Sequence, residues 1–164
     1  TAVTSIPSPS DYCTKPPIER DMMALETKDL TTTILETNQR LLDAIAGGDY
    51  DTYDLLCADD MTCIEPESKG VVVEGKGFHR YYFDLGHSGQ TNLLKNKSDD
   101  ATITKIKTNV TMSQPHVRLI ANSTVAIVSY IRLNQTSTTT TQLSETRVWE
   151  LQKGEWKHLH FHKS

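Results

Sequence analysis

Residues 143–163 of this chain read LSETRVWEL-QKGE-WKHLHFHK, which is the pattern of two β-strands joined by a short turn. The turn contains Gly154, and glycine readily takes the positive φ that tight hairpin connections require. We therefore predict a β-hairpin here, and we expect the rest of the molecule to be organised around it.

Charged side chains share the apolar faces of this predicted hairpin. Because successive side chains of a strand point to opposite faces, Glu145, Arg147 and Trp149 fall on one face of the first strand. By the same rule Phe161 and Lys163 share a face of the second strand. An unpaired buried charge is costly, so these cations must be paired or must open into a polar cavity. The sequence therefore predicts a cavity lined by cations.

A long amphipathic helix is predicted upstream, from about Thr27 to Gly47. Its apolar side chains recur at helical spacing and form a single stripe: Leu30, Ile34, Leu35, Leu41, Leu42 and Ile45. Gly47 and Gly48 end this helix, as glycines commonly do. Asp49 then has the position of an N-cap for a second, shorter helix. Because the long helix has one apolar stripe, we expect it to lie across a sheet.

The middle of the chain is predicted to form short strands, a third helix and a long antiparallel meander. Short strands are expected at 61–64 and 71–73, and strands of the meander at 102–112, 116–121 and 125–133. The third helix opens at Gly75–Gly77, and its aromatic stripe is expected to pack in the core: Phe78, Tyr81, Tyr82 and Leu85. Because both faces of 125–133 are apolar, that strand is expected to be covered on both sides. This order predicts an α+β fold, with one long and two short helices packed in a curved antiparallel sheet.

Residues 1–24 are predicted to form a flexible linker, which leaves 25–164 as the folded domain. Prolines at 7, 9, 16 and 17 are interspersed with serine and threonine, and no apolar periodicity is present. Such a segment buries too little apolar surface to offset the entropy that it loses on ordering.

The composition argues against several classes of partner. A formal net charge of -4 with no long basic run argues against nucleic acid. No apolar stretch approaches the roughly 20 residues of a membrane span, and the sequence shows no signal-peptide core, so we expect a cytoplasmic protein without membrane partners. Cys13, Cys57 and Cys63 lack the spacing of a disulfide framework or a zinc motif, so we expect reduced thiols and no cofactor.

Eight short strings along residues 27–164 resemble the association (hub) domain of calcium/calmodulin-dependent protein kinase II. In order, they are DAI…GDY (43–50), TCIEPE (62–67), VEG (73–75), FHRYYF (78–83), PHV (115–117), YIRL (130–133), SETRVW (144–149) and HFH (160–162). The order of helices and strands is also similar to the cone-shaped fold of the nuclear transport factor 2-like superfamily. Eight ordered matches are far more specific than one short motif. The chain is thus identified as a divergent member of the hub family.

The resemblance implies a non-catalytic oligomerisation module of a calmodulin-binding serine/threonine kinase. Hub domains of this family form dimers that close into two stacked rings, a dodecamer or tetradecamer, and so gather the kinase domains. The implied partners are other copies of this chain and the kinase and regulatory segments of the parent protein. The glycine-rich loop, HRD and DFG signatures of a kinase do not occur in the sequence, so this chain is not expected to transfer phosphate.

The resemblance also implies a pocket for small carboxylates of the γ-hydroxybutyrate type. The family's binding positions fall on His79, Arg132 and Arg147, with Lys163 in place of an arginine. Lysine is a point charge, whereas arginine holds a carboxylate with a two-pronged fork, so the substitution bears on ligand affinity. A second departure is the stretch 85–108, which is longer than the family's loop and is expected to affect ring closure or stoichiometry.

Internal pairing is the main alternative to ligand binding. The cations of the pocket would then contact carboxylates of the same chain, for which the candidates are Glu65, Glu67 and Glu145. Pairing and binding are compatible, because a ligand carboxylate can replace an internal one.

The histidines at 158, 160 and 162 alternate along the second hairpin strand, so they are predicted to share a face with Trp156. Three imidazoles on one face suit zinc, but no fourth ligand is evident. We therefore expect a subunit contact there, and no metal site.

Two other functions fit the same fold class. Isomerases and dehydratases place an acidic base and tyrosine donors in the cone, and here Glu65 or Glu67 with Tyr81 or Tyr82 would take those parts. A dimeric adaptor is the third interpretation, and it differs from the ring only in stopping at two subunits.

Overall fold

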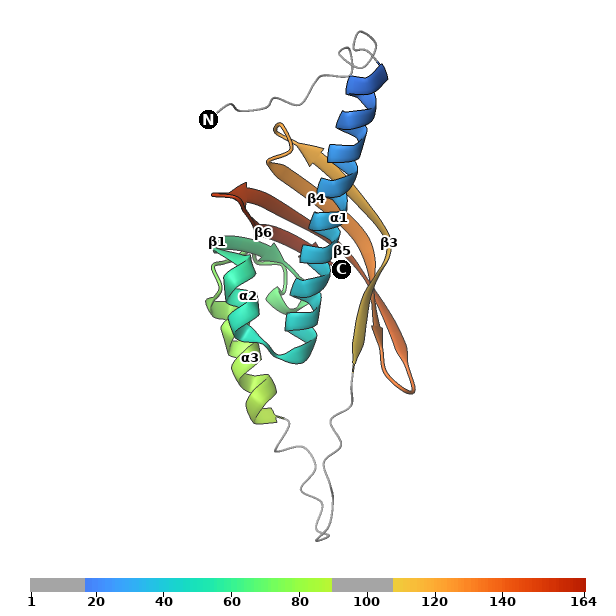
Figure 1. Cartoon of the computed structure of the whole chain (residues 1–164). Helices are drawn as coiled ribbons and strands as arrows, with labels where there is room; N and C mark the ends of the chain where they lie inside the picture. Colours follow the sequence, from blue (N-terminus) through green and yellow to red (C-terminus); the bar gives the residue numbers. More distant parts are fainter. Residues whose placement is uncertain (1–16, 90–107) are drawn as a thin grey trace, which may run out of the picture.

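The computed structural model describes residues 17–89 and 108–164, which form three α-helices and a six-stranded sheet (Figure 1). In chain order the elements are α1 (Pro17–Gly47), α2 (Tyr50–Leu56), β1 (Cys57–Ile64), the 3₁₀ helix η2 (Pro66–Ser68), β2 (Val73–Glu74), α3 (Gly77–Gly89), β3 (Asn109–Ile120), β4 (Val125–Gln135), β5 (Thr140–Gln152) and β6 (Glu155–Lys163). The predicted α+β class is confirmed.

The strands are ordered β2-β1-β6-β5-β4-β3, so the predicted hairpin, β5–β6, lies in the middle of the sheet. Neighbouring strands are antiparallel except β1 and β6, which pair in parallel. This pairing departs from the predicted antiparallel pattern. A hairpin turn would make neighbouring strands antiparallel, whereas β1 and β6 are joined through most of the chain, which allows them to run in parallel. Helix α1 runs across the face of the sheet, and α2 and α3 lie together beside β1 (Figure 1).

Helix α1 packs the predicted apolar stripe against the sheet. Ile34, Leu41 and Leu42 are fully buried. Asn38, on the same face, is also fully buried and accepts a hydrogen bond from the indole Nε1 of Trp149 on β5, at 3.1 Å. The long helix and the central hairpin are therefore joined by apolar contact and by one buried polar contact.

The start of α1 differs from the prediction. The helix begins at Pro17, before the predicted start at Thr27, so residues 17–24 are helical although the sequence predicts a linker there. Proline fits the first turn of a helix, and no further proline or glycine occurs before Gly47. The rest of the predicted linker, residues 1–16, lies outside the described residues.

The hairpin has the predicted turn but contains a β-bulge. Lys153 and Gly154 both take positive φ, 53° and 88°, as a tight turn requires. Val148 pairs with His160 whereas Trp149 pairs with His158, so Leu159 is an extra residue on β6.

The bulge changes which side chains of β6 point inward. Glu145, Arg147 and Trp149 of β5 are buried, as alternation predicts. On β6, however, Trp156 and His158 are buried together with Phe161, while His162 is exposed. The predicted face shared by the three histidines and Trp156 is therefore wrong.

Helix α3 buries a different face from the one predicted. Its buried residues are His79 and Phe83, and Phe83 packs on Tyr53 of α2 with ring centroids 5.1 Å apart. Tyr81 and Tyr82 are 60% and 43% exposed. The predicted aromatic core stripe is thus turned largely to the surface, because contact with α2 and β1 selects the opposite side of the helix.

The remaining strands also differ in detail. The predicted strands 102–112 and 116–121 are one strand, β3, whose register shifts between Ser113 and His116, and 102–107 lie outside the described residues. The predicted strand 71–73 is reduced to β2, which pairs Val73 with Cys63. Most of the long stretch 85–108 lies outside the described residues as well.

Strand β4 is buried on one face only. Ala126, Val128 and Tyr130 point inward and are buried, whereas the outer face is half-exposed and carries Val125, Ile127, Ile131 and Leu133. The prediction that this strand is covered on both sides does not hold for the single chain.

Across the described part of the chain, no helix has both the length and the apolar character that crossing a bilayer would need.

Candidate functional site

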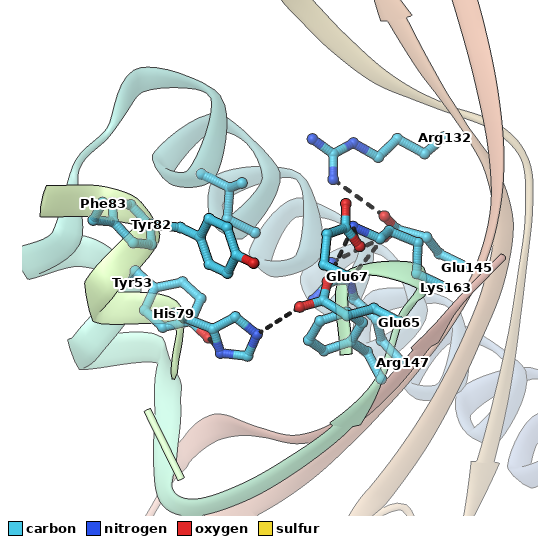
Figure 2. Close-up of a pocket in the computed structure, with 12 residues that line it drawn as sticks. Tyr53, Glu65, Glu67, His79, Tyr82, Phe83, Arg132, Glu145, Arg147 and Lys163 are labelled. Atoms are coloured by element: carbon cyan, nitrogen blue, oxygen red, sulfur yellow. Dashed lines mark hydrogen bonds and ion pairs between the residues drawn. The ribbon is translucent and has the colours of Figure 1, made fainter. Parts of the chain in front are cut away.

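A cavity of about 180 Å³ lies between the sheet and the helices (Figure 2). All four residues predicted for a carboxylate pocket line it: His79, Arg132, Arg147 and Lys163. The other lining residues are Ile45, Tyr53, Glu65, Glu67, Tyr82, Phe83, Glu145 and Phe161. The three carboxylates that the sequence offers as internal partners therefore face the same cavity as the cations.

Arg147 and Glu145 form the buried ion pair at the base of the cavity. Arg147 is 1% exposed, and its Nη2 and Nε donate to Glu145 Oε2 at 2.9 and 3.1 Å. The guanidinium lies over the ring of Phe161, 4.6 Å from the centroid. Because the two residues are two apart on β5, strand alternation places both on the inner face.

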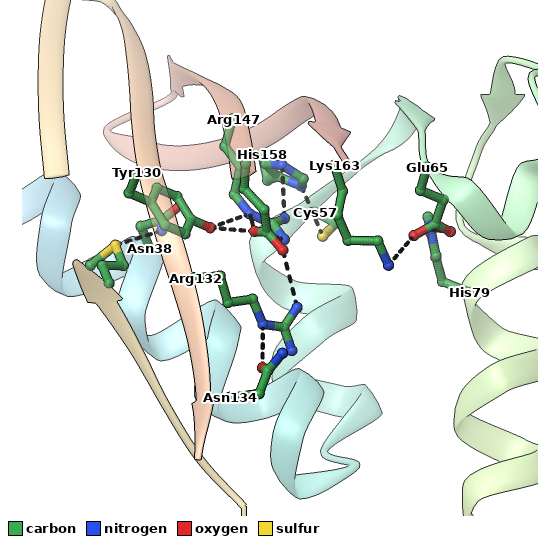
Figure 3. Close-up of polar contacts among 12 residues, drawn as sticks. Asn38, Cys57, Glu65, His79, Tyr130, Arg132, Asn134, Arg147, His158 and Lys163 are labelled. Carbon is green, nitrogen blue, oxygen red and sulfur yellow. Dashed lines mark hydrogen bonds and ion pairs between the residues drawn. The ribbon is translucent and has the colours of Figure 1, made fainter. Parts of the chain in front are cut away.

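Two residues of strand β4 also donate hydrogen bonds to Glu145. Tyr130, which is directly opposite in the ladder, donates its hydroxyl to Glu145 Oε2 at 2.5 Å. Arg132 donates from Nη1 to Glu145 Oε1 at 3.1 Å and from Nε to Asn134 Oδ1 at 2.8 Å (Figure 3). One carboxylate thus pairs with two arginines that come from adjacent strands.

A second ion-pair group lies across the cavity. Lys163 Nζ contacts Glu65 Oε2 and Glu67 Oε2, each at 3.0 Å. The other oxygen of Glu65, Oε1, is 3.4 Å from Nε2 of His79 on α3 (Figure 2). Glu65 is held in place because it is the N-cap of η2, where Ser68 closes a reciprocal capping box with it.

These contacts keep both groups ionised. Burial disfavours the charge of Glu145, but the positive charges of Arg147 and Arg132 outweigh it and hold the pKa of this carboxyl at about 2. Burial likewise disfavours the charge of Lys163, and hydrogen bonds to Glu67 and Glu65 reverse this effect and raise its pKa. At neutral pH three cations and three carboxylates therefore balance within one cavity.

His158 is the buried site residue that sequence analysis placed on the wrong face. Its Nε2 lies 3.3 Å from Arg147 Nη1, and its Nδ1 lies 3.6 Å from Cys57 Sγ (Figure 3). A neutral imidazole fits both contacts, since Nε2 then accepts from arginine and Nδ1 donates to sulfur. The sequence does contain a signal for it. Trp156 and Phe161 are an odd number of positions apart, so both can face the core only if a bulge lies between them.

We expect the stability of the domain to fall as pH drops below 6.5 because of His158. Burial, and then the charge of Arg147, hold the pKa of His158 well below its usual 6.5, so the folded state keeps it neutral. In the unfolded chain His158 takes up a proton near pH 6.5. Its contribution to the free energy of unfolding is therefore complete above pH 6.5, and it decreases as the pH falls toward the lower pKa that His158 has in the folded state. The slope is up to about 1.4 kcal/mol per pH unit.

Urea unfolding between about pH 7.5 and pH 5.5 measures this effect. In His158→Gln the same part of the profile should be flatter, whatever the absolute stability of the variant. Equal slopes in the variant and in the original protein would contradict the assignment.

Comparison with known sequences identifies a family that covers most of the chain. The family described as Calcium/calmodulin dependent protein kinase II association domain matches residues 31–164. The Calcium/calmodulin-dependent protein kinase type II of Caenorhabditis briggsae is 37% identical over 136 residues, which is 80% of this chain and 22% of the relative. The chain therefore spans under a quarter of that relative's length.

Comparison with solved structures agrees. The C. reinhardtii CamKII hub homology domain is similar with a TM-score of 0.68 and 43% identity, over 81% of this chain and 95% of that domain. The association domain of C. elegans CaMKII is similar with a TM-score of 0.67 and 35% identity, over 84% and 96%. An NTF2-like protein of Cytophaga hutchinsonii, at 22% identity and a TM-score of 0.58 over 82% and 96%, shares the fold alone. The predicted nuclear transport factor 2-like fold is confirmed.

Proposed function

This chain belongs to the family of calcium/calmodulin-dependent protein kinase II association domains, and we propose that it is the non-catalytic hub that joins copies of a parent kinase into a two-ring dodecamer or tetradecamer. The association-domain homologues support an oligomerisation role. In this proposal, the assembly brings together the catalytic and regulatory segments of the parent kinase.

The observation that carries the proposal is the apolar outer face of β4. Ile127 lies there between Arg118 of β3 and Val148 of β5, and it is only partly buried in the single chain. Val125, Ile131 and Leu133 extend the same row. The row lies on the sheet face opposite to α1, and a second copy docked on it would remove these side chains from water. An isologous contact uses one self-complementary patch, which suits a dimer.

A closed ring needs a second contact surface besides the dimer face. Large apolar side chains are exposed near the opposite edge of the sheet, on α3 and on the segment before β2: Val71, Val72, Tyr81, Tyr82 and Leu85. Exposed large apolar side chains on neighbouring segments are typical of an interaction surface when they form one patch. We assign it to the contact that repeats around the ring.

The native mass of the purified domain at micromolar concentration tests the assembly. A single species of a dozen or so subunits, measured by native mass spectrometry or light scattering, is the expected result. A stable dimer would refute the ring and would favour the adaptor interpretation.

The cavity of each subunit is proposed to bind a small carboxylate. The hydrogen bonds of Arg132 use Nε and Nη1, and Nη2 has no hydrogen-bond partner within residues 17–89 and 108–164. Glu67 is the most exposed of the three carboxylates, with 46% of its side chain exposed against 7% for Glu65. An incoming carboxylate can therefore displace Glu67 from Lys163 and accept from Arg132 without separating the buried Arg147–Glu145 pair.

Replacing Glu67 with glutamine should tighten the binding of γ-hydroxybutyrate. The change frees Lys163 from a competing carboxylate, and a gain of about threefold to tenfold in affinity corresponds to about 1 kcal/mol for a half-exposed charge pair. Isothermal titration measures the affinity. Glu155→Gln, which alters an exposed carboxylate paired with Lys157 outside the cavity, is the matched control and should leave it unchanged. Weaker binding in Glu67→Gln would show that Glu67 supports the ligand and does not compete with it.

The isomerase or dehydratase alternative fits the cavity less well. A general base works best with a pKa near the working pH, whereas the pKa of Glu145 is about 2 and that of Glu65 is also below its usual value. For Glu65, burial opposes this lowering, and hydrogen bonds from His79 and Lys163 outweigh it. These carboxylates are held as ion-pair partners, which favours a binding cavity over an acid–base site.

A further inference from the structure

Three side chains with metal-binding atoms converge at one side of the cavity. They are Cys63 on β1, Glu65 just after β1 and His79 on α3, and their ligand atoms all lie within 4.8 Å of one another. They are 1%, 7% and 9% exposed. Cys63 and Glu65 are two residues apart, and side chains two apart on an extended chain point to the same side. Both therefore point toward α3. Helix α3 then brings His79 to them.

The two distances from His79 are those of neighbouring ligands around one tetrahedral ion. His79 Nε2 is 3.5 Å from Cys63 Sγ and 3.4 Å from Glu65 Oε1. Zinc bonds of about 2.0–2.1 Å to nitrogen or oxygen and about 2.3 Å to sulfur, at tetrahedral angles, separate neighbouring ligand atoms by roughly 3.3–3.6 Å. We propose that Cys63, Glu65 and His79 form a binding site for a zinc-like divalent ion, a site that goes beyond the hub function proposed above.

The surrounding residues orient the ligands as metal sites require. His79 Nδ1 lies 2.8 Å from the Tyr53 hydroxyl, and this hydroxyl lies 3.3 Å from Met61 Sδ (Figure 2 shows the histidine between Tyr53 and Glu65). If Nδ1 donates to Tyr53 and Tyr53 donates to Met61, Nε2 is left with its lone pair toward the ion. The second oxygen of Glu65 is held by Lys163, which leaves Oε1 for the ion.

The charges directly around Lys163 balance when an ion is bound, because a divalent ion and Lys163 carry three positive charges and Glu65, Glu67 and the Cys63 thiolate carry three negative ones. The cavity as a whole, with Arg132, Arg147 and Glu145 included, gains one net positive charge. Burial and the negative charge of Glu65 raise the pKa of the Cys63 thiol to about 12, so the metal-free protein holds it as a thiol. Binding then exchanges the thiol proton for the ion and releases that proton to solvent.

The fourth position of the ion would open toward the cavity. Glu65 and His79 both line the cavity, so a water molecule or a small carboxylate can complete the coordination from that side. Three protein ligands and one open position are the arrangement of zinc sites that bind an exchangeable ligand.

The test uses the chelator-treated, assembled domain and the metal alone. Titration with Co²⁺ should give one ion per subunit, with the visible bands of tetrahedral Co²⁺ and a near-ultraviolet thiolate-to-metal band, and Zn²⁺ should displace it. Cys63→Ser should lose the thiolate band and at least about tenfold in affinity, an effect of the size seen when even a supporting residue of a metal site is lost. Cys57→Ser, which removes another buried thiol, is the matched control and should bind as the original protein does.

Circular dichroism and native mass of each variant show whether it remains folded and assembled, so a failure of this site is distinguishable from a failure of the hub proposal. Co²⁺ binding without a thiolate band, or equal affinity in a folded Cys63→Ser, would reflect surface imidazoles such as that of His162 and would overturn the proposal. If Cys63→Ser does not fold, the thiolate band of a variant that carries both Cys13→Ser and Cys57→Ser decides the question, because Cys63 is then the only thiol left in the sequence.

Discussion

Glu145→Gln should lower the free energy of unfolding by about 3–5 kcal/mol, because it removes the buried carboxylate that pairs with two arginines. Arg147 is 1% exposed and donates twice to Glu145, and Arg132 donates to its other oxygen. Glutamine has almost the same shape but no charge, so the loss reports the ion pairs more than the packing. Urea unfolding of the two proteins at equal concentration measures the difference.

Glu155→Gln is the matched control for this change. Glu155 also pairs with a cation, Lys157, but its side chain is 69% exposed, so its removal should cost within about 1 kcal/mol. A loss below about 1 kcal/mol in Glu145→Gln would mean that Tyr130 and water satisfy the arginines without the charge, and that the ion-pair description of the cavity is wrong.

Ile127→Glu should convert the large assembly to small species. The substitution places a carboxylate in the middle of the apolar row on the outer face of β4, where the proposed contact between two copies would bury it. Because the outer face is only partly buried in the single chain, the variant should still fold, with an unchanged far-ultraviolet circular dichroism spectrum. Native mass spectrometry measures the number of subunits.

Thr138→Glu adds the same charge in the exposed connection between β4 and β5 and should leave the mass unchanged. If Ile127→Glu remains folded and keeps the full mass, the outer face of β4 is not a subunit contact, and the exposed cluster on α3 would have to supply both contacts of the ring.

The candidate site was largely predictable because its charges are placed by strand alternation. Glu145 and Arg147 are two residues apart on β5, so a charged inner face follows from the sequence once the strand is recognised. The family resemblance added His79 and Arg132, and both line the cavity. What alternation does not give is the choice of partners, since Arg132 and Lys163 each had several carboxylates to pair with.

The errors share one physical cause, which is that local patterns do not report packing between distant segments. The extra residue Leu159 reverses which side chains of β6 face inward, and it turns His158 toward Arg147. Helix α3 has two faces with aromatic side chains, and its contacts with Tyr50 and Tyr53 of α2 select Phe83 for the interior. Both faces of α3 carry aromatic residues, so periodicity alone cannot tell which face is buried. It favours the face with Tyr81 and Tyr82, which is exposed.

From the sequence alone follow the α+β class, the central hairpin with its charged inner face, and the likeness to association domains, because alternation, helical spacing and ordered motifs are properties of contiguous residues. The tertiary structure alone decides that Glu145 serves two arginines, that Lys163 joins Glu65 and Glu67, and that Cys63 and Glu65 meet His79. Those contacts depend on the register of β6 and on where α3 packs, and both are set by the free energy of burying segments that lie far apart along the chain.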